Sequence, residues 1–522
     1  MLTEAMKGCH LRTWATDCHS MRGLHHRFLS PRLFAPLSVL LFVGITLPAL
    51  GAEVHGAADS TEAIHAPEAS HAGEEAHAGP MPSILATLPF VVLLLCIALL
   101  PLIQRTEHWW EHNSSKLKVA LSLAAVTSVY YLLRDFGFHH SDPGLAALLG
   151  VYQHAILADY VPFIVLLFSL FTISGGINLR GDLPAHPATN TTILAIGAAL
   201  ASFIGTTGAA MLLIRPLLQI NSERRRVKHT VIFFIFLVAN IGGSLLPIGD
   251  PPLFLGYLRG VPFLWTFQLL AEWALCCGVL LIVYYAWDLY EYRKETPSDV
   301  ARDEGIREPL RFRGLANVPL LVGVVLAVAL LVPGKVYFGL TIPPYLREGV
   351  QLALAGISWM VTSREIRKAN GFTFFAINEV ACLFIGIFIT MMPAIEILQA
   401  RGADLGLNSP AHFFWATGIL SSFLDNAPTY VVFFEVAGAL PASPAHELAL
   451  VGGGHVNEML LVGISCGAVF MGAMSYIGNG PNFMVKSIAE QSGVQMPSFF
   501  GYMAYSCLVL LPLFALVTWI FF

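Results

Sequence analysis

The sequence predicts an all-α membrane protein, and three observations support this fold class. Of its 522 residues, 56% are hydrophobic and only 12% are charged, whereas soluble domains average about 45–50% apolar and about 25% charged residues. The mean hydropathy is +0.68. Apolar segments long enough for a hydrocarbon core of about 30 Å recur along the chain, so we expect about eleven to thirteen transmembrane spans or half-spans. No segment has the composition of a soluble catalytic domain, and we do not expect an enzyme.

The N-terminal segment, residues 1–52, has the pattern of a secretory signal. Basic residues between Arg22 and Arg32 precede an apolar core, and small residues at Gly51 and Ala52 fit a cleavage site. We expect a signal peptide, with residues 1–20 as an over-called start. An uncleaved first helix is the alternative, because helices and signals look alike at this length.

Residues 53–80 differ sharply from the apolar segments that follow. They are rich in Ala, Glu and His and contain no Lys, no Arg and no aromatic residue. Such a segment cannot bury a core, so we expect a disordered His-rich linker. After signal cleavage it would be the mature N-terminus on the periplasmic side of a bacterial inner membrane.

The basic residues predict which loops face the cytoplasm. By the positive-inside rule, five segments do so: Arg105–Lys118, Arg180, Arg224–Lys228, Glu291–Gly314 and Ser363–Lys368. Arg180 and Arg224 would then lie on one side, which a single straight span between them cannot satisfy. We therefore expect a re-entrant hairpin bent near Gly205 to Gly208. Irregular backbone at membrane depth is tolerated only where it is buried or lines a cavity, so this bend is a candidate site.

Two pairs of similar segments indicate an internal repeat. The stretch "SFIGTTG" from Ser202 resembles "SFLDNAP" from Ser422, and "IGDPPLF" from Ile248 matches "IGNGPNF" from Ile477. The pairs occur in the same order. We therefore divide the transporter-like region into a first half (81–290), a cytoplasmic loop (291–315) and a second half (316–522). Matching Gly/Pro-interrupted apolar segments in two halves are typical of secondary transporters and mark their binding site.

At these residues the chain resembles the ion-transporter superfamily, which includes arsenite permeases, NhaD-type sodium/proton antiporters and citrate carriers. It is most similar to the group described as citrate transport or sodium/proton antiporter proteins. Four motifs carry the resemblance: Gly205–Pro216, Val238–Phe263, Ser421–Glu435 and Ser475–Glu490. The resemblance implies inverted repeats, each with a re-entrant hairpin and a broken helix, and a homodimer with an elevator-type transport domain.

The chain departs from the carboxylate carriers at their paired signatures, which read Ser-Asn-Thr in both halves. Here the corresponding places read Gly205-Thr206-Thr207 and Asp425-Asn426-Ala427. This difference favours sodium/proton antiport over citrate transport. Neutral hydroxyl groups and half-helix N-termini could still hold a carboxylate, so citrate or a related carboxylate is the alternative substrate.

Asp425 is the residue that we expect to couple the two ions. A carboxylate within the bilayer costs about 2.5–3.5 kcal/mol on insertion scales, so it is normally functional. Its oxygens suit sodium, and burial favours protonation, so a proton could replace the cation. The other expected ligands are Asn426, Thr429, Thr206, Thr207, Asn240, Ser244, Asp250, Asn479 and Asn482. Asp250 is either a ligand or an N-cap before the paired prolines.

Glu379 lies in an apolar segment and is a candidate proton relay. We expect no cofactor besides the transported sodium or proton, and no nucleic-acid partner, because no basic stripe is present. The expected partners are the lipid bilayer, a small cation or carboxylate, and a second copy of the chain. A membrane-embedded hydrolase is less favoured, since no HExxH motif occurs and the two-half repeat explains more of the sequence.

Overall fold

The computed structural model describes residues 81–138, 141–305, 308–337, 339–441 and 446–522. The expected signal peptide and His-rich linker lie outside the described residues. The part that is described is an all-α membrane protein, as predicted. Six helices are long and apolar enough to cross a membrane, or up to seven if a pair bent by 45°, Phe375–Thr390 and Met392–Leu405, forms one span. Other apolar helices are shorter, among them Thr206–Ile220, Lys228–Ser244, Asn317–Leu330 and Glu458–Met474.

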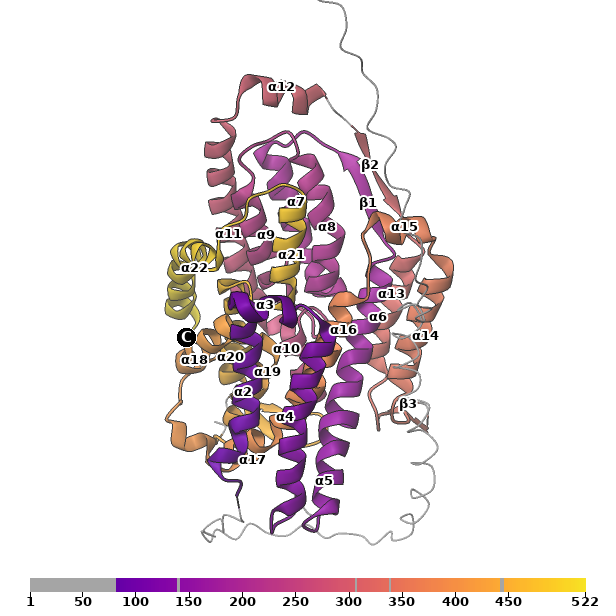
Figure 1. The fold of residues 1–522 in the computed structure, drawn as a ribbon, viewed down its shortest axis with the longest axis vertical. Helices are drawn as coiled ribbons and strands as arrows, with labels where there is room; N and C mark the ends of the chain where they lie inside the picture. Colours follow the sequence, from indigo (N-terminus) through magenta and orange to yellow (C-terminus); the bar gives the residue numbers. More distant parts are fainter. Residues whose placement is uncertain (1–80, 139–140, 306–307, 338, 442–445) are drawn as a thin grey trace, which may run out of the picture. The chain divides into compact units, whose positions relative to one another are not determined.

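The first half begins with three long apolar helical segments, Ile84–Leu102, Asn113–Leu133 and Leu145–Ser174. It continues with a pair of helices that meet at a sharp bend and a broken helix (Figure 1). Its helices are α2 (Leu88–Leu99), α3 (Gln104–Trp110), α4 (Asn113–Leu133), α5 (Leu145–Tyr152), η3 (Gln153–Tyr160), α6 (Val161–Ser174), α7 (Pro187–Ile204), α8 (Thr206–Ile220), α9 (Lys228–Leu237), η4 (Ile241–Ser244), α10 (Pro251–Leu258), η5 (Trp265–Leu269) and α11 (Leu270–Tyr292). Short 3-10 turns, η1 (Ile84–Thr87) and η2 (Leu100–Leu102), flank α2.

The second half repeats this order of elements. It consists of α13 (Asn317–Leu330), α14 (Leu346–Val361), α15 (Arg364–Ala369), α16 (Phe375–Thr390), α17 (Met392–Arg401), η6 (Gly402–Leu405), α18 (Pro410–Phe423), α19 (Asn426–Gly438), α20 (Glu458–Met471), η8 (Gly472–Met474), α21 (Gly480–Gln491) and α22 (Phe499–Phe521). Between the halves lies α12 (Pro297–Gly305).

Three short antiparallel strand pairs accompany the helices. They are β1 (Asn178–Asp182) with β2 (Glu308–Arg313), β3 (Val336–Tyr337) with β4 (Leu340–Thr341), and β5 (Glu447–Ala449) with β6 (His455–Asn457). In the first pair Arg180 lies opposite Arg311. This pair ties the loop before α7 to the segment that links the two halves.

The predicted bend of the first half is found at Gly205. Helix α7 ends at Ile204 and α8 starts at Thr206, while Gly205 between them has φ +79°, which a residue with a side chain rarely adopts. The two helices pack against each other. Arg224, just after α8, donates to the carbonyl of Ala185, just before α7 (3.1 Å). The chain thus enters and leaves this hairpin at the same end.

The second half turns at the equivalent position. Helix α18 ends at Phe423 and α19 starts at Asn426, with Asp425 as its N-cap. Both broken helices also match: α9 and η4 lead to the N-cap Asp250 of α10, and α20 and η8 lead to the N-cap Asn479 of α21. The repeat read from the sequence therefore corresponds to a repeat of helix breaks.

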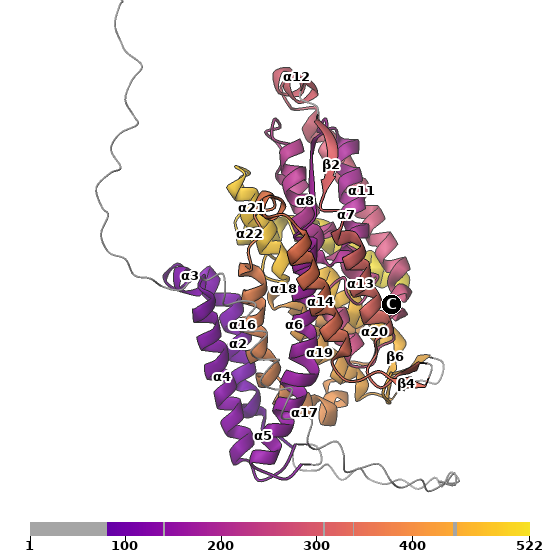
Figure 2. The same ribbon diagram turned by 90° about the vertical axis from the view of Figure 1, so that its right-hand side faces the viewer.

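The two halves interlock through exchanged contacts. Helix α10 packs against α19, and its counterpart α21 packs against α8; likewise α4 packs against α16, and α6 against α14. In Figures 1 and 2, α7 and α8 lie toward the end that carries α12, whereas α17 and α19 lie toward the opposite end. The hairpins therefore approach the centre from opposite ends, as inverted repeats do.

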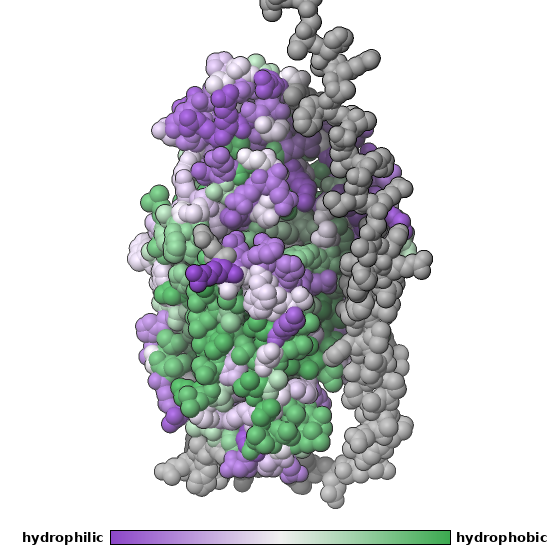
Figure 3. All heavy atoms as spheres, in the orientation of Figure 1, coloured by the Kyte–Doolittle hydropathy of each residue, from purple (hydrophilic) through white to green (hydrophobic). Residues whose placement is uncertain are grey.

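The surface agrees with a membrane location. Figure 3 shows a broad apolar area on this face below a polar end formed around α12. Many large apolar side chains are exposed on the long helices, including Leu133 on α4, Ile282 on α11 and Trp519 on α22. Lipid would cover such side chains, since exposed apolar surface of this extent is unusual in water.

Glycine at 249 lets the broken helix of the first half fold back on itself. A Cβ there would lie 2.2 Å from the carbonyl oxygen of Gly243 and 3.0 Å from the Cα of Ser202, both backbone atoms. We expect Gly249→Ala to destabilise the protein by about 1–3 kcal/mol through overpacking. Thermal unfolding in detergent measures this. The matched change Gly480→Ala, in a place with no atom within 4 Å, should leave the midpoint unchanged, and equal midpoints for both variants would contradict the prediction.

Candidate substrate and ion site

The candidate site forms where four helices begin. The first residues of α8 and α19 are Thr206 and Asn426, and the N-caps of α10 and α21 are Asp250 and Asn479. The exchanged packing of the two halves brings these four starts together. Each start carries backbone N–H groups without helical partners and a partial positive charge. The breaks at Gly205, Asp425 and the two N-caps thus create one polar centre inside an apolar protein.

Asp250 is the centre of this group. Its Oδ1 accepts hydrogen bonds from the hydroxyl of Thr206 (2.9 Å) and the amide of Asn479 (3.1 Å), and its Oδ2 accepts one from the amide of Asn426 (2.6 Å). The side chain is 1% exposed. Although Asp250 occupies an N-cap position, its carboxylate caps no backbone N–H. The carboxylate instead interacts with side chains of both halves, and its role as an ion ligand stays a prediction.

Two further asparagines, Asn240 and Asn482, support Asn479, which donates to the carboxylate of Asp250. Asn240 donates to Asn482 (2.7 Å) and to the carbonyl of Ile235 (2.8 Å), and it accepts from Asn479 (3.3 Å). Asn482 in turn donates to the carbonyls of Gly472 and Ser475 (2.8 and 2.9 Å). These amides fix the orientation of Asn479 and satisfy the carbonyls that the helix breaks leave free.

Asp425, the expected coupling residue, lies at the edge of the group. Its carboxylate accepts a hydrogen bond from the backbone N–H of Ala427 (3.1 Å), which is a helix N-cap interaction. Its carbonyl accepts from the hydroxyl of Thr429 (3.0 Å). Asp425 is partly exposed, whereas Asp250 is buried. The ion-coupling role of Asp425 stays a prediction.

The remaining expected ligands lie close in sequence but make other contacts. Ser244 donates to the carbonyl of Ile241 within its own turn (2.7 Å). Thr207 follows Thr206 but is only partly buried and makes no side-chain hydrogen bond within the described residues. Thr429 bonds to Asp425, as noted above. Of the neighbouring residues Thr206 and Thr207, it is Thr206 that contacts the carboxylate of Asp250.

Glu379, the expected proton relay, belongs to a different pair. It lies on α16 and contacts the ammonium of Lys116 on α4 at 2.5 Å. Lys116 is buried, and the side chain of Glu379 is 37% exposed. This ion pair joins α4 of the first half to α16 of the second half. A relay role for Glu379 stays a prediction, and its observed contact is structural.

Serines that were not among the expected ligands stabilise the helix breaks. Ser202 donates to the carbonyl of Gly242 (2.6 Å) and accepts from the N–H of Leu245 (3.0 Å). Ser475 donates to the carbonyl of Ser422 (2.5 Å), and Ser422 is the repeat partner of Ser202. The repeat itself was the available signal, because the two serines occupy equivalent positions in it.

The electrostatics of the group are unusual. Within the part of the chain that the structure describes, Asp250 forms no ion pair, and the carbonyl oxygen Oδ1 of Asn426 is buried without a hydrogen-bond partner. A buried carboxylate without a counter-charge is costly unless it binds a cation or a proton. The polar centre therefore provides oxygen ligands next to positive helix ends, which suits joint binding of a cation and an anion. Among the described residues no three His, Cys, Asp or Glu side chains form a metal-binding group.

Comparison with known proteins identifies the family of the chain. The family model described as "Putative citrate transport" matches residues 80–522, which include both repeats and all residues of the polar centre. No curated protein matches the chain. Since the match covers most of the chain, the protein belongs to the putative citrate transport family.

Proposed function

We propose that the protein is a secondary transporter of citrate or a related small carboxylate, coupled to a cation or proton bound at Asp250. The observation that carries this proposal is the buried carboxylate of Asp250, held only by neutral side chains from both halves. Movement of one half relative to the other would break the hydrogen bonds of Asp250 to Asn426 and Asn479. Substrate binding and conformation would thereby be linked.

The convergence of helix N-termini supports a carboxylate substrate. Positive helix ends and free backbone N–H groups bind anions in many proteins, and discontinuous helices of transporters use them for substrate carboxylates. Thr206, Asn426 and Asn479 add neutral donors at the same place. These donors would replace the Ser-Asn-Thr signatures that the chain lacks.

The carboxylate of Asp250 supports coupling. An anionic substrate beside an unpaired buried carboxylate would be repelled, so a cation or proton must accompany it. Asn426 Oδ1 is an acceptor without a donor next to Asp250, and hard cations such as sodium prefer such oxygens. We place the coupling ion at Asp250, with Asp425 as a second carboxylate nearby.

Sodium/proton antiport without a carboxylate substrate is the second candidate. The specific observation in its favour is the presence of two acids, Asp250 and Asp425, at the breaks of the two halves. One acid that binds sodium and a proton in turn gives exchange by competition. The same residues thus serve both candidates, and transport measurements must separate them.

Purified protein in proteoliposomes separates the two candidates. Under the main proposal, labelled citrate accumulates inside, and an inward sodium or proton gradient increases the accumulation. Under the second candidate, sodium or lithium dissipates an imposed pH gradient although no citrate accumulates. Failure to transport either citrate or these cations contradicts both. Potassium and arsenite serve as comparison substrates.

Replacement of Asp250 tests the coupling role. Asp250→Asn keeps the shape of the side chain but removes its charge, so we expect the protein to insert and fold while coupled transport falls at least about tenfold, equivalent to ~1.4 kcal/mol. Uptake with and without the ion gradient is the measurement. Transport that retains its gradient dependence in this variant would place the coupling ion elsewhere.

Replacement of Asp425 tests the prediction made from sequence. Asp425→Asn should fold normally, because Asn is as good an N-cap as Asp, yet it should abolish ion-coupled transport at every pH if the carboxylate binds the ion. Asp425→Glu should keep partial activity with a changed pH profile. Wild-type rates and an unchanged profile in Asp425→Asn would show that this carboxylate only caps α19.

A further inference from the structure

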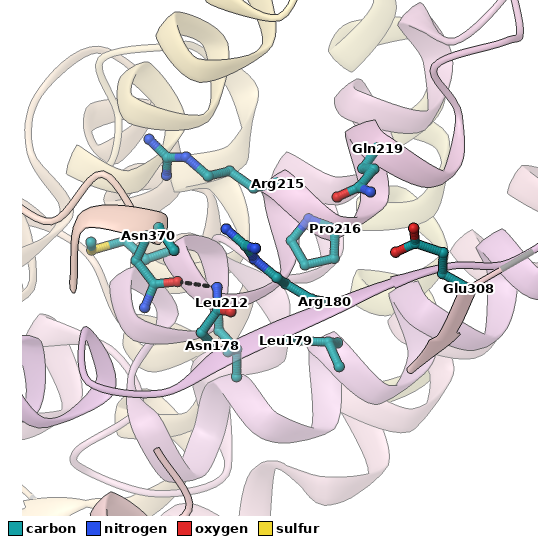
Figure 4. A pocket seen from close by; sticks show the side chains of 11 residues that line it. Asn178, Leu179, Arg180, Leu212, Arg215, Pro216, Gln219, Glu308 and Asn370 are labelled. Carbon is teal, nitrogen blue, oxygen red and sulfur yellow. Dashed lines mark hydrogen bonds between the residues drawn. The ribbon is translucent and has the colours of Figure 1, made fainter. Parts of the chain in front are cut away.

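A cavity lies at the end of the molecule that carries α12 and α15, away from Asp250. Its volume is about 270 Å³, and it lies between β1, the second half of α8, the start of β2 and the end of α15 (Figure 4). Small-molecule sites usually have volumes of about 300–1,000 Å³. A ligand of this cavity must therefore be compact.

The cavity is positively charged. Arg180 on β1 and Arg215 on α8 line it, against a single acid, Glu308. In Figure 4 both guanidinium groups extend toward the Asn370 side of the cavity, whereas Glu308 lies on the other side. Neither arginine forms an ion pair with a carboxylate in the described ranges, and Nη1 of Arg215 is buried without a hydrogen-bond partner there. A buried N–H group of a guanidinium is costly without an acceptor, so an external anion would stabilise Arg215 here.

Strand pairing adds further positive charge beside the cavity. Arg180 lies directly opposite Arg311 in the antiparallel pair, and Asn178 lies opposite Arg313. Like charges directly opposite each other in a strand pair are destabilising, and such pairs have Cβ atoms about 4.5–5.5 Å apart. An anion between these side chains would remove the repulsion.

The repeat shows that Arg215 differs from its counterpart. Position 215 corresponds to Glu435 in the second half, because Thr206 corresponds to Asn426. Glu435 is paired within the protein: Arg259 donates to it (3.1 Å) and also contacts Asp159 (3.1 Å). The charge of Glu435 is thus neutralised internally, whereas Arg215 has no ion-pair partner among the described residues.

We propose that this cavity is a second binding site for a compact polycarboxylate of the citrate class, on the side expected to be cytoplasmic; the identity of the ligand rests on the proposed function. The guanidinium groups of Arg180 and Arg215 would each bind a carboxylate in bidentate fashion. The amides of Asn178 and Gln219, which also line the cavity, would bind other oxygens.

Helix α8 links this cavity to the polar centre. Arg215 follows Thr206 by nine residues, which corresponds to about 13 Å along a helix axis. Thr206 contacts Asp250 at the start of the same helix. An anion held by Arg215 would therefore occupy a site separate from Asp250 but attached to the same rigid element, as expected for a substrate arriving at or leaving the centre.

Calorimetric titration of the purified full-length chain with citrate tests the proposal. Asp250→Asn should retain a citrate site. In that background Arg215→Gln or Arg180→Gln should weaken citrate binding at least about tenfold, since each removes charged hydrogen bonds. Arg364→Gln, an exposed arginine on α15 that does not line the cavity, is the matched control and should bind as before. Arg180→Gln changes an exposed strand residue, so it remains informative if Arg215→Gln fails to fold.

Three results would overturn the proposal. One is loss of all citrate binding in Asp250→Asn, which leaves a single site at the polar centre. Another is equal binding by the arginine variants and the Arg364→Gln control. The third is tighter binding of inorganic phosphate than of citrate, which assigns the cavity to phosphate. Failure of vesicles to transport citrate, combined with arginine-dependent citrate binding in Asp250→Asn, would instead contradict the proposed function and leave the cavity site intact.

Discussion

The architecture depends on one buried carboxylate that neither half can satisfy alone. Asp250 belongs to the first half, but two of its three side-chain partners, Asn426 and Asn479, come from the second. Burial of an unsatisfied carboxylate would cost several kcal/mol, so the two halves must meet at this point. The exchanged packing of α10 on α19 and of α21 on α8 is the larger-scale counterpart of these bonds.

The helix breaks then follow from the need to bring polar backbone to this point. A continuous helix would have used its own N–H groups and left none for a ligand. Gly205 and the Gly/Pro-rich segments stop the helices at the depth of Asp250, and the asparagines and serines around them occupy the freed carbonyls. Each of these polar residues is costly in an apolar protein and is compensated by a specific bond.

Much of this could be predicted from the sequence. The fold class follows from composition, and the repeat locates all four breaks to within a few residues because Gly, Pro, Asp and Asn interrupt the apolar segments at matching places in both halves. Asp250, Thr206, Asn426 and Asn479 were all among the expected ligands. The sequence does not show which of the two acids lies at the centre of the polar group. Tertiary packing decides this, because it surrounds Asp250 with polar side chains and leaves Asp425 as a helix N-cap. Pair partners such as Lys116 for Glu379 also depend on packing between distant segments.

The unequal charges at equivalent positions have an energetic consequence. In a transporter whose two inverted halves were identical, the inward-open and outward-open forms would be related by the two-fold axis of the repeat and equally populated. Instead, Arg259 after α10 bridges Asp159 on η3 and Glu435 on α19, whereas Arg215, at the position equivalent to Glu435, forms no ion pair within the described residues. In the proposed transporter, this asymmetry would make one orientation more populated than the other at rest, whereas the direction of net transport would still be set by the gradients alone.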